Sequence, residues 1–134
     1  VHSNFKMPKA EMTKRLIRAI ENQHIDIIAH PTGRIIHQRS GYEFNFDEIC
    51  KSAAKTKTIL EINSYPNRLD LNDANIRRAI GYGVKISLGT DSHSKNQLYN
   101  LDLGIAQARR GWATKKDCVN CLTAEELLKF LRGK

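Results

Sequence analysis

Hydrophobic and polar positions along the chain alternate between a helical pattern and short apolar runs. In residues 8–22 apolar side chains recur at the three- and four-residue spacing of an amphipathic helix. Residues 25–29 form a run rich in β-branched side chains that is too short for a helix and indicates a buried strand. The alternation then repeats. It predicts strands over 58–63 and 84–88, and helices over 45–55, from 72 or 73 to 81 or 83, over 98–110 and over 123–132.

Polar residues at two helix starts support these boundaries. Asn45 is followed three positions later by Glu48, which is the pattern of an N-cap and its partner. Thr123 and Glu126 form a similar pair before the last helix, where they predict a capping box. These local signals fix where the helices begin.

Strands separated by helices predict an α/β fold in which parallel strands are joined by right-handed crossovers. Residues 1–2 are interpreted as the tail of one further strand. Such strands form either a small open sheet or part of a barrel, and in both cases functional residues gather at the carboxyl ends. No linker, repeat or low-complexity tract is visible, so we expect residues 1–134 to form one domain. Because the first residue is not Met, we expect that domain to be a fragment of a longer chain.

Two residues of metal-ligand type follow the third predicted strand. Asp91 and His93 are separated by one residue, and in an extended segment such residues point to the same side. A carboxylate oxygen and an imidazole nitrogen together suit Mn²⁺, Zn²⁺ or Fe²⁺. The alternative is a loop in which Asp91 caps a turn and His93 is solvated.

The first predicted strand ends in a further candidate, His30. Pro31 favours extended geometry in the residue before it, which directs His30 off the strand end. For this residue alone, a histidine at the rim of the core is an equal alternative. Because His30, Asp91 and His93 all end predicted strands, the three together favour a metal site, and they are the candidate catalytic residues.

Three arginines lie in the loops beside these candidates. Arg34 and Arg39 follow the first strand, and Arg68 follows the second. Guanidinium groups bind phosphate oxygens bidentately, so these residues suit a phosphoester substrate, although surface salt bridges are the alternative. Glu61 and Asn63 share one side of their strand and could orient the ligands. A buried Glu61 paired with Arg68 is an equally good interpretation.

Composition narrows the function further. The chain has a net charge of +8 and an isoelectric point near 9.6, which favour an anionic partner such as nucleic acid. It contains no apolar run long enough to span a membrane. The three cysteines favour a reducing compartment. Cys118 and Cys121 have the spacing of half a zinc site, but no second pair follows, so packing is favoured. No nucleotide-binding loop or serine-nucleophile motif occurs, which leaves metal-assisted hydrolysis.

Five short segments occur in the order AHPTGR (29–34), LEIN (60–63), RLD (68–70), TDSH (90–93) and ARRGW (108–112). Together they closely resemble the C-terminal PHP domain (polymerase and histidinol phosphatase) of bacterial and archaeal family X DNA polymerases. The resemblance implies part of a distorted (β/α)7 barrel with a multinuclear Mn²⁺ or Zn²⁺ cluster at the carboxyl ends of its strands. It also implies a phosphoesterase with 3′–5′ exonuclease activity in DNA repair.

By the same resemblance, the metal ligands are His2, His30, Asp91 and His93, with Arg34 beside the site. The H-x-H motif that opens the family's domain has no counterpart here. We therefore expect the C-terminal part of the barrel alone, inactive or weakly active by itself. We also expect that its open edges invite dimerisation.

The expected partners are DNA and the rest of the polymerase chain, in the cytoplasm and associated with the nucleoid. Two alternatives stay open. One is a small-molecule phosphatase of the histidinol-phosphate type, and the other is a structural or DNA-docking module without catalysis.

Overall fold

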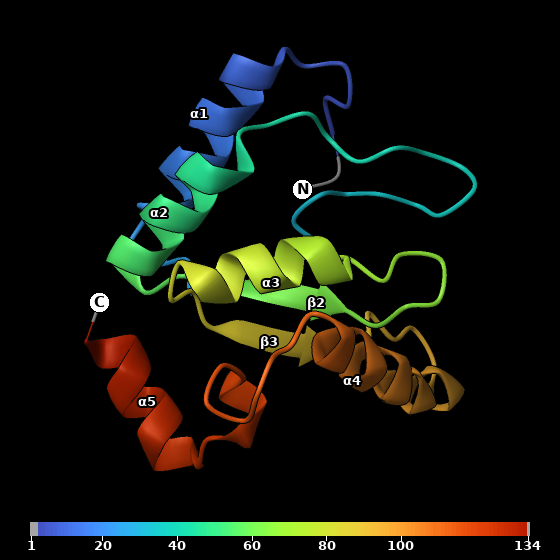
Figure 1. Cartoon of the computed structure of the whole chain (residues 1–134), viewed down its shortest axis with the longest axis vertical. Helices are drawn as coiled ribbons and strands as arrows, with labels where there is room; N and C mark the ends of the chain where they lie inside the picture. Colours follow the sequence, from blue (N-terminus) through green and yellow to red (C-terminus); the bar gives the residue numbers. More distant parts are fainter. Residues whose placement is uncertain (1–2, 134) are drawn as a thin grey trace.

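The computed structural model describes residues 3–133, which form a parallel sheet flanked by helices (Figure 1). The candidate ligand His2 lies outside the described residues. The main elements are, in chain order, α1 (Lys9–Ile20), β1 (Ile27–Ile28), α2 (Phe46–Thr56), β2 (Ile59–Asn63), α3 (Asp73–Gly81), β3 (Ile86–Gly89), α4 (Leu101–Arg110) and α5 (Ala124–Arg132). Two short 3₁₀ helices, η1 (Lys95–Asn100) and η2 (Val119–Cys121), flank α4.

The predicted α/β order is confirmed, and the differences lie at element ends. A strand was predicted over 25–29, but β1 is limited to Ile27–Ile28, because only these two residues pair with β2. The helix predicted over 98–110 begins as the 3₁₀ turn η1 and becomes α-helical at Leu101. No residue of η1 is buried, so no packing holds that turn in α-helical geometry.

The helix starts follow the predicted caps. The side chain of Asn45 accepts a hydrogen bond from the backbone N–H of Glu48, and Asn72 caps α3 through Asn75. Thr123 and Glu126 form the predicted capping box at α5. Each cap satisfies an N–H group that the first helical turn leaves without a partner.

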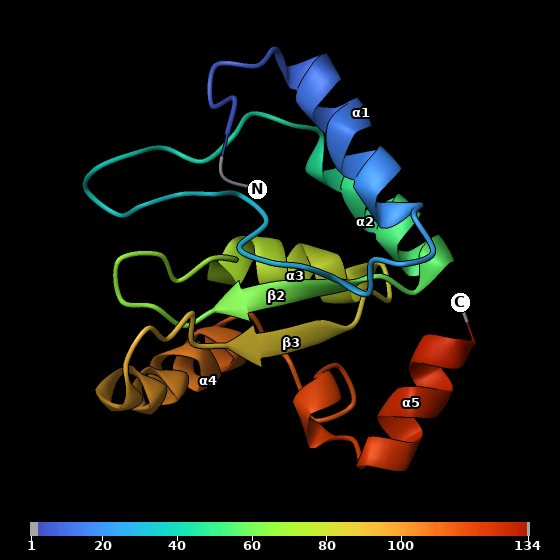
Figure 2. The same ribbon diagram turned by 180° about the vertical axis from the view of Figure 1, so that it is seen from behind.

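The sheet has the order β1-β2-β3 with all strands parallel. Ile28 pairs with Leu60, and Leu60 pairs with Ile86. The arrowheads of β2 and β3 therefore point the same way in Figure 2, and the strand ends share one edge. Over residues 3–133 this is an open sheet, so the (β/α)7 barrel stays a prediction.

The hydrophobic core lies between the sheet and its helices. Leu60, Ile62 and Ile86 are fully buried and pack in one cluster with residues of α1, α2 and α3. Helices α3 and α4 lie side by side on the same face of the sheet (Figures 1 and 2). Helix α5, in contrast, contains no buried residue. None of the described helices is long and apolar enough to cross a membrane.

The outer edge of β3 is covered by residues 117–121. The N–H of Ile86 donates to the carbonyl oxygen of Asp117 at 2.9 Å. The Asn120 side chain accepts from the Leu88 N–H at 2.7 Å and donates to the Leu88 carbonyl at 3.1 Å. Cys118 is buried in the core cluster, whereas Cys121 is exposed. Core packing, the interpretation favoured for this cysteine pair, is thus confirmed for Cys118.

Candidate active site

The candidate residues lie where the strands end. His30 follows β1 by two residues, Glu61 and Asn63 belong to β2, and Asp91 follows β3 by two residues. In parallel α/β sheets this edge is where ligands bind, because the connecting loops form a crevice there. The fold therefore brings together segments that are far apart in the sequence.

Glu61 links the three strand ends. Its Oε2 accepts a hydrogen bond from the backbone N–H of His30 at 2.6 Å, and the Asn63 amide lies 3.4 Å away. On the other side the carboxylate lies over Gly89, where an added Cβ would stand 2.3 Å from Oε1. Burial raises the pKa of Glu61, and the hydrogen bond from His30 opposes that rise. Glu61 thus positions the loop that carries His30.

Arg68 pairs with Asp91 rather than with Glu61. Its Nε lies 3.2 Å from Asp91 Oδ2, and the two side chains are 15% and 29% exposed. The alternative in which Arg68 neutralises a buried Glu61 is therefore wrong as a direct contact. The ion pair connects the loop after β2 with the loop after β3 and holds the Asp91 carboxylate at the strand edge.

Two candidate ligands have backbones in the left-handed region. The φ angles of His30 and Asp91 are 31° and 53°. The extended geometry predicted for His30 before Pro31, and for the segment from Asp91 to His93, is therefore wrong, because the chain turns at both residues directly after its strands end. Residues with a Cβ adopt this region at a cost, and such residues cluster at functional sites. His30 is also buried, at 5% exposure, which fits the interpretation as a histidine at the rim of the core.

His93 has a partner that favours one ring nitrogen for a metal. Its Nδ1 lies 2.7 Å from the carbonyl oxygen of Asp91. A proton on Nδ1 makes this a hydrogen bond and leaves the Nε2 lone pair available, which is the arrangement typical of metal-bound histidine. The backbone N–H of His93 donates to Gln97 Oε1 at 2.6 Å, which fixes the loop further.

The candidate residues offer donor atoms of the types that bind metal ions. His30, Asp91 and His93 offer imidazole nitrogen and carboxylate oxygen, the donors that Mn²⁺ and Zn²⁺ accept. Within residues 3–133, however, no three His, Cys, Asp or Glu side chains gather closely enough to enclose an ion. The structure thus brings the three donors to one edge without assembling them around one point.

Arg34 and Arg39 are held by backbone carbonyls. Arg34 Nε donates to the Arg68 carbonyl at 2.7 Å, and its Nη2 donates to the carbonyl of Leu69. Arg39 donates to the Gly33 carbonyl through Nη2 at 2.9 Å and stacks on the ring of Phe5. In the described part of the chain neither arginine forms an ion pair. Their positive charges therefore remain available to an anion.

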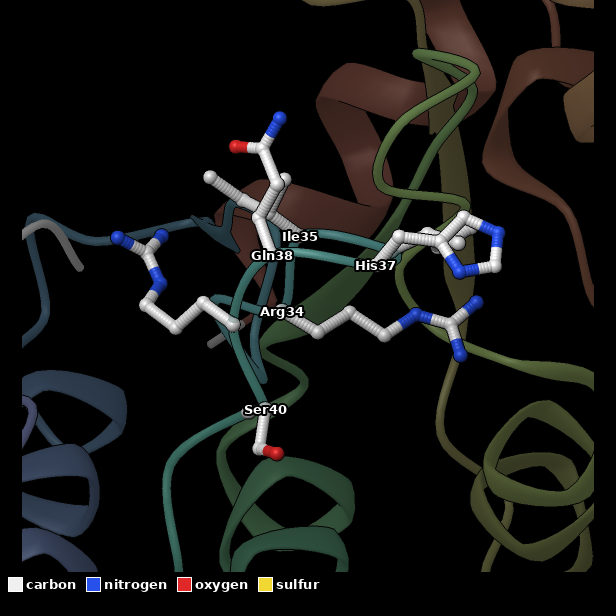
Figure 3. A pocket seen from close by; sticks show the side chains of 8 residues that line it. Arg34, Ile35, His37, Gln38 and Ser40 are labelled. Carbon is white, nitrogen blue, oxygen red and sulfur yellow. The ribbon is translucent and has the colours of Figure 1, made fainter.

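The loop that carries these arginines borders an open, shallow hollow of about 470 Å³ lined by residues 34–41. Paired backbone hydrogen bonds between Ile35 and Arg39 close the loop. Figure 3 shows the Arg34 guanidinium and the His37 imidazole on the same side of it. His37 is exposed, and nothing in the sequence indicates that it lies beside Arg34.

Asp70 is a functional candidate that sequence reasoning missed. It is fully buried, and its Oδ2 accepts hydrogen bonds from the backbone N–H groups of Thr32 at 3.0 Å and Gly33 at 2.8 Å. Burial raises the pKa of Asp70 to about 6. The carboxylate anchors the loop after β1 to the loop after β2. Its one sequence signal was its place in the RLD segment (68–70), which carries no structural pattern of its own.

Comparison with known proteins gives related sequences, while no family model matches the chain. The DNA polymerase/3'-5' exonuclease PolX of Bacillus subtilis is 40% identical over 132 residues, covering 98% of this chain and 23% of that protein. A probable phosphatase of Clostridium novyi is 26% identical over 92% of the chain, and one of Clostridium acetobutylicum is 32% identical over 67%. The chain spans less than a quarter of the PolX length, and 50% and 37% of the two phosphatases.

Proposed function

Since this chain belongs with the PHP-type domain of family X DNA polymerases, we propose that it contributes to a metal-dependent phosphoesterase that processes DNA 3′ ends. One observation carries the proposal: the 40% identity to a DNA polymerase/3'-5' exonuclease extends over 98% of the chain. The strand-edge position of His30, Asp91 and His93 supports it. A phosphodiester substrate also agrees with the net charge of +8.

In this proposal His30, Asp91 and His93, with His2, hold Mn²⁺ or Zn²⁺. When bound, such an ion supplies Lewis acidity and an activated water for hydrolysis. Glu61 and Asn63 hold the His30 loop in position through the Glu61 carboxylate. The protein's own residues thus set the geometry on which the ion depends.

The arginines take the substrate's charge. Arg34 and Arg39 donate to neutral carbonyl acceptors and form no ion pair among residues 3–133, so they can attract phosphate, although Arg34 also interacts with the buried Asp70 carboxylate. Arg68 is paired with Asp91. If Asp91 held a metal ion, its carboxylate would neutralise Arg68 less, and the Arg68 guanidinium would then be available to a phosphate oxygen. DNA and the remainder of a polymerase chain are the partners that this function requires, in the cytoplasm at the nucleoid.

Asp91→Asn tests the proposal. In the protein that carries this chain, we expect the change to lower Mn²⁺-dependent release of nucleotides from a 3′-recessed duplex by at least about 100-fold. Loss of a group that only orients a ligand lowers activity by up to about 100-fold, and loss of the ligand itself should lower it at least as much. Asp47→Asn is the matched control, because it also breaks an ion pair, with Arg78 at 2.8 Å, but one that joins α2 to α3 and not the loops after the strands. Unchanged release by the Asp91 variant would remove Asp91 from the site.

A small-molecule phosphatase is the second candidate, favoured by the probable phosphatases among the relatives. Rates on a 3′-recessed duplex and on histidinol phosphate, measured with the same protein and metal, separate the two. Faster turnover of histidinol phosphate would replace the nuclease proposal. Salt-sensitive DNA binding with no hydrolysis of either substrate would favour a DNA-docking module instead.

A further inference from the structure

Trp112 presents an exposed aromatic ring in a fixed turn after α4. The side chain is 63% exposed, and its backbone φ of 65° lies in the left-handed region, which disfavours a bulky residue. The preceding Gly111 is buried so tightly that an added Cβ would stand 2.5 Å from Ile76 Cγ2. The Trp112 N–H donates to the Arg109 carbonyl at 3.0 Å. The turn therefore holds a large apolar ring in water at one defined place.

A guanidinium group covers this ring. The central carbon of Arg77 lies 3.4 Å from the centroid of the Trp112 ring, which is a close cation–π stack. Arg77 belongs to α3 and Trp112 follows α4, so the stack joins the two helices that lie side by side in Figure 1. Both side chains are exposed. A flat, charged aromatic surface is thus ready to receive a further planar group.

The segment that contains Trp112 carries excess positive charge. Residues 109–116 contain four cations and no acidic residue. Arg110 pairs with Asp73 at 3.0 Å, and Arg78 pairs with Asp47 at 2.8 Å. Across residues 3–133, ion pairs occur at none of the other cations in this region, which are Arg77, Arg109, Lys115 and Lys116.

The nearby acid, Asp117, offsets only part of this charge. Asp117 Oδ2 accepts hydrogen bonds from Thr114, through its N–H at 2.8 Å and its hydroxyl at 2.7 Å, and it forms no ion pair in the described segment. It closes the turn after Trp112. Asp117 and Asp73, which is paired with Arg110, thus face five cations in this region, Arg77, Arg109, Arg110, Lys115 and Lys116.

We propose that this surface, the α3–α4 platform (Arg77, Arg109, Trp112, Lys115 and Lys116), binds single-stranded DNA. An indole ring stacks on any base, and the surrounding cations attract the phosphates. A base-paired duplex keeps its base faces stacked inside, so the platform selects unpaired strands. None of its residues belongs to the loops after the strands that carry the candidate active site. It is therefore a separate binding surface.

The choice of DNA as the partner rests on the proposed function. An acidic protein segment would be attracted by the same cations, but it would leave the stacked indole without a planar partner. The Trp112 ring therefore favours the nucleic acid. The experiment below measures binding without hydrolysis, so that it can fail or succeed independently of the phosphoesterase.

Trp112 is the one tryptophan in the chain, so its fluorescence reports directly on the platform. We expect an oligo-dT of about 16 nucleotides, titrated in EDTA at low salt, to quench this fluorescence saturably. A duplex of equal length should quench it less. In anisotropy measurements with labelled oligo-dT, affinity should fall as salt rises, because phosphate contacts release counterions.

Variants separate stacking from general charge. Trp112→Ala and Arg77→Ala should each weaken oligo-dT binding about ten-fold, while Trp112→Phe, which keeps a ring, should retain most of it. Arg18→Ala is the matched control, because it removes one exposed cation from α1 and should leave affinity nearly unchanged. Circular dichroism checks each fold. If Trp112→Ala fails to fold, the oligo-dT affinities of Arg77→Ala and Trp112→Phe still test the proposal.

Three results would contradict the proposal that the α3–α4 platform binds single-stranded DNA. One is no quenching by oligo-dT at low salt, and another is equal affinity of the Arg18 and Arg77 variants. The third is quenching and displacement by poly-glutamate as strong as by oligo-dT, which would assign the surface to an acidic protein segment. Absence of DNA hydrolysis with Mn²⁺, combined with intact oligo-dT binding, would instead overturn the phosphoesterase and leave the platform standing.

Discussion

Asp70 shows how a single buried carboxylate can organise a site at an energetic cost. It accepts backbone N–H groups of Thr32 and Gly33, and so fixes the start of the loop that carries Arg34 and Arg39. Those hydrogen bonds and the Arg34 charge lower its pKa, but burial outweighs them and raises the pKa from the ordinary 3.8 to about 6. The same carboxylate therefore holds the loop and weakens the fold when it is charged.

This raised pKa gives a pH dependence with a definite sign. Between pH 3.8 and about 6 native Asp70 keeps a proton that the unfolded chain has released. Its contribution to the free energy of unfolding therefore falls as pH rises through this range and is constant above it. At about 1.4 kcal/mol per pH unit, the free energy of unfolding of the wild type, minus that of Asp70→Asn, should fall by about 3 kcal/mol as pH rises from 3.8 to about 6. Urea unfolding of both proteins across this pH range measures it.

Asp73 provides the control of opposite sign. Arg110 lowers the pKa of Asp73, so the stability that this carboxylate adds is lost as pH falls through its folded pKa. The free energy of unfolding of the wild type, minus that of Asp73→Asn, should thus fall as the pH is lowered. A flat difference for Asp70→Asn over the same range would show that burial does not govern Asp70.

Gly89 is required by the position of Glu61 rather than by its own backbone. Gly89→Ala would place a Cβ 2.3 Å from Glu61 Oε1, so the carboxylate must move away from the His30 N–H. We expect a stability loss of about 1–3 kcal/mol, with phosphoesterase activity reduced about ten-fold or more, as for other groups that orient ligands. Unfolding by urea and nuclease assays measure the two effects.

Gly81→Ala is the matched control, because no atom lies within 4 Å of its added Cβ. Since Gly81 is the last residue of α3, alanine there should be neutral or raise stability by up to about 1 kcal/mol. Equal effects at the two positions would contradict the assigned role of the Glu61 carboxylate.

At the scale of elements, the outer edge of β3 is covered by a side chain that forms the two hydrogen bonds a neighbouring strand would form. Asn120 satisfies both the N–H and the C=O of Leu88, at the outer edge where exposed strands associate. This contact limits the edge-to-edge dimerisation that an open sheet predicts. Dimerisation itself stays a prediction.

Asn120→Ala should uncover that edge. We expect faster hydrogen exchange at the Leu88 amide, a stability loss of about 1 kcal/mol, and concentration-dependent self-association in sedimentation experiments. Asn100→Ala is the control, because Asn100 stands at the N-cap of α4 without a side-chain cap bond. A monomeric Asn120 variant with unchanged Leu88 exchange would contradict this role.

Helix ends were the most predictable features at this scale. The caps at Asn45 and Thr123 formed as their sequence patterns predict, because a capping bond joins residues only three positions apart. Strand lengths were less predictable. Within the apolar run 25–29 only Ile27 and Ile28 pair with β2, and no local pattern in the run distinguishes them from their neighbours.

At the scale of the whole molecule, metal binding should couple the strand ends to overall stability. An ion that binds only the folded chain adds about 1.4 kcal/mol at ten times its dissociation constant. We therefore expect Mn²⁺ or Zn²⁺ to raise the thermal unfolding midpoint of the wild type, and to raise it less in Asp91→Asn and His93→Ala.

His24→Ala is the control for this effect, since His24 is exposed and precedes β1, away from the carboxyl edge. Its midpoint should rise with metal as the wild type does. An equal rise in all three variants would place the ion elsewhere, and no rise in the wild type would contradict metal binding by this chain.

The sequence by itself determined the order of elements, the helix caps and the strand-end positions of His30, Asp91 and His93. The elements and caps depend on residues a few positions apart, and the strand-end positions follow from where each apolar run stops. Only the tertiary structure decided that Arg68 pairs with Asp91, that Asp70 anchors the His30 loop and that Arg77 stacks on Trp112. Each of these contacts joins separate loops or helices, and the packing of the whole chain chooses among partners that are equally compatible with the local sequence.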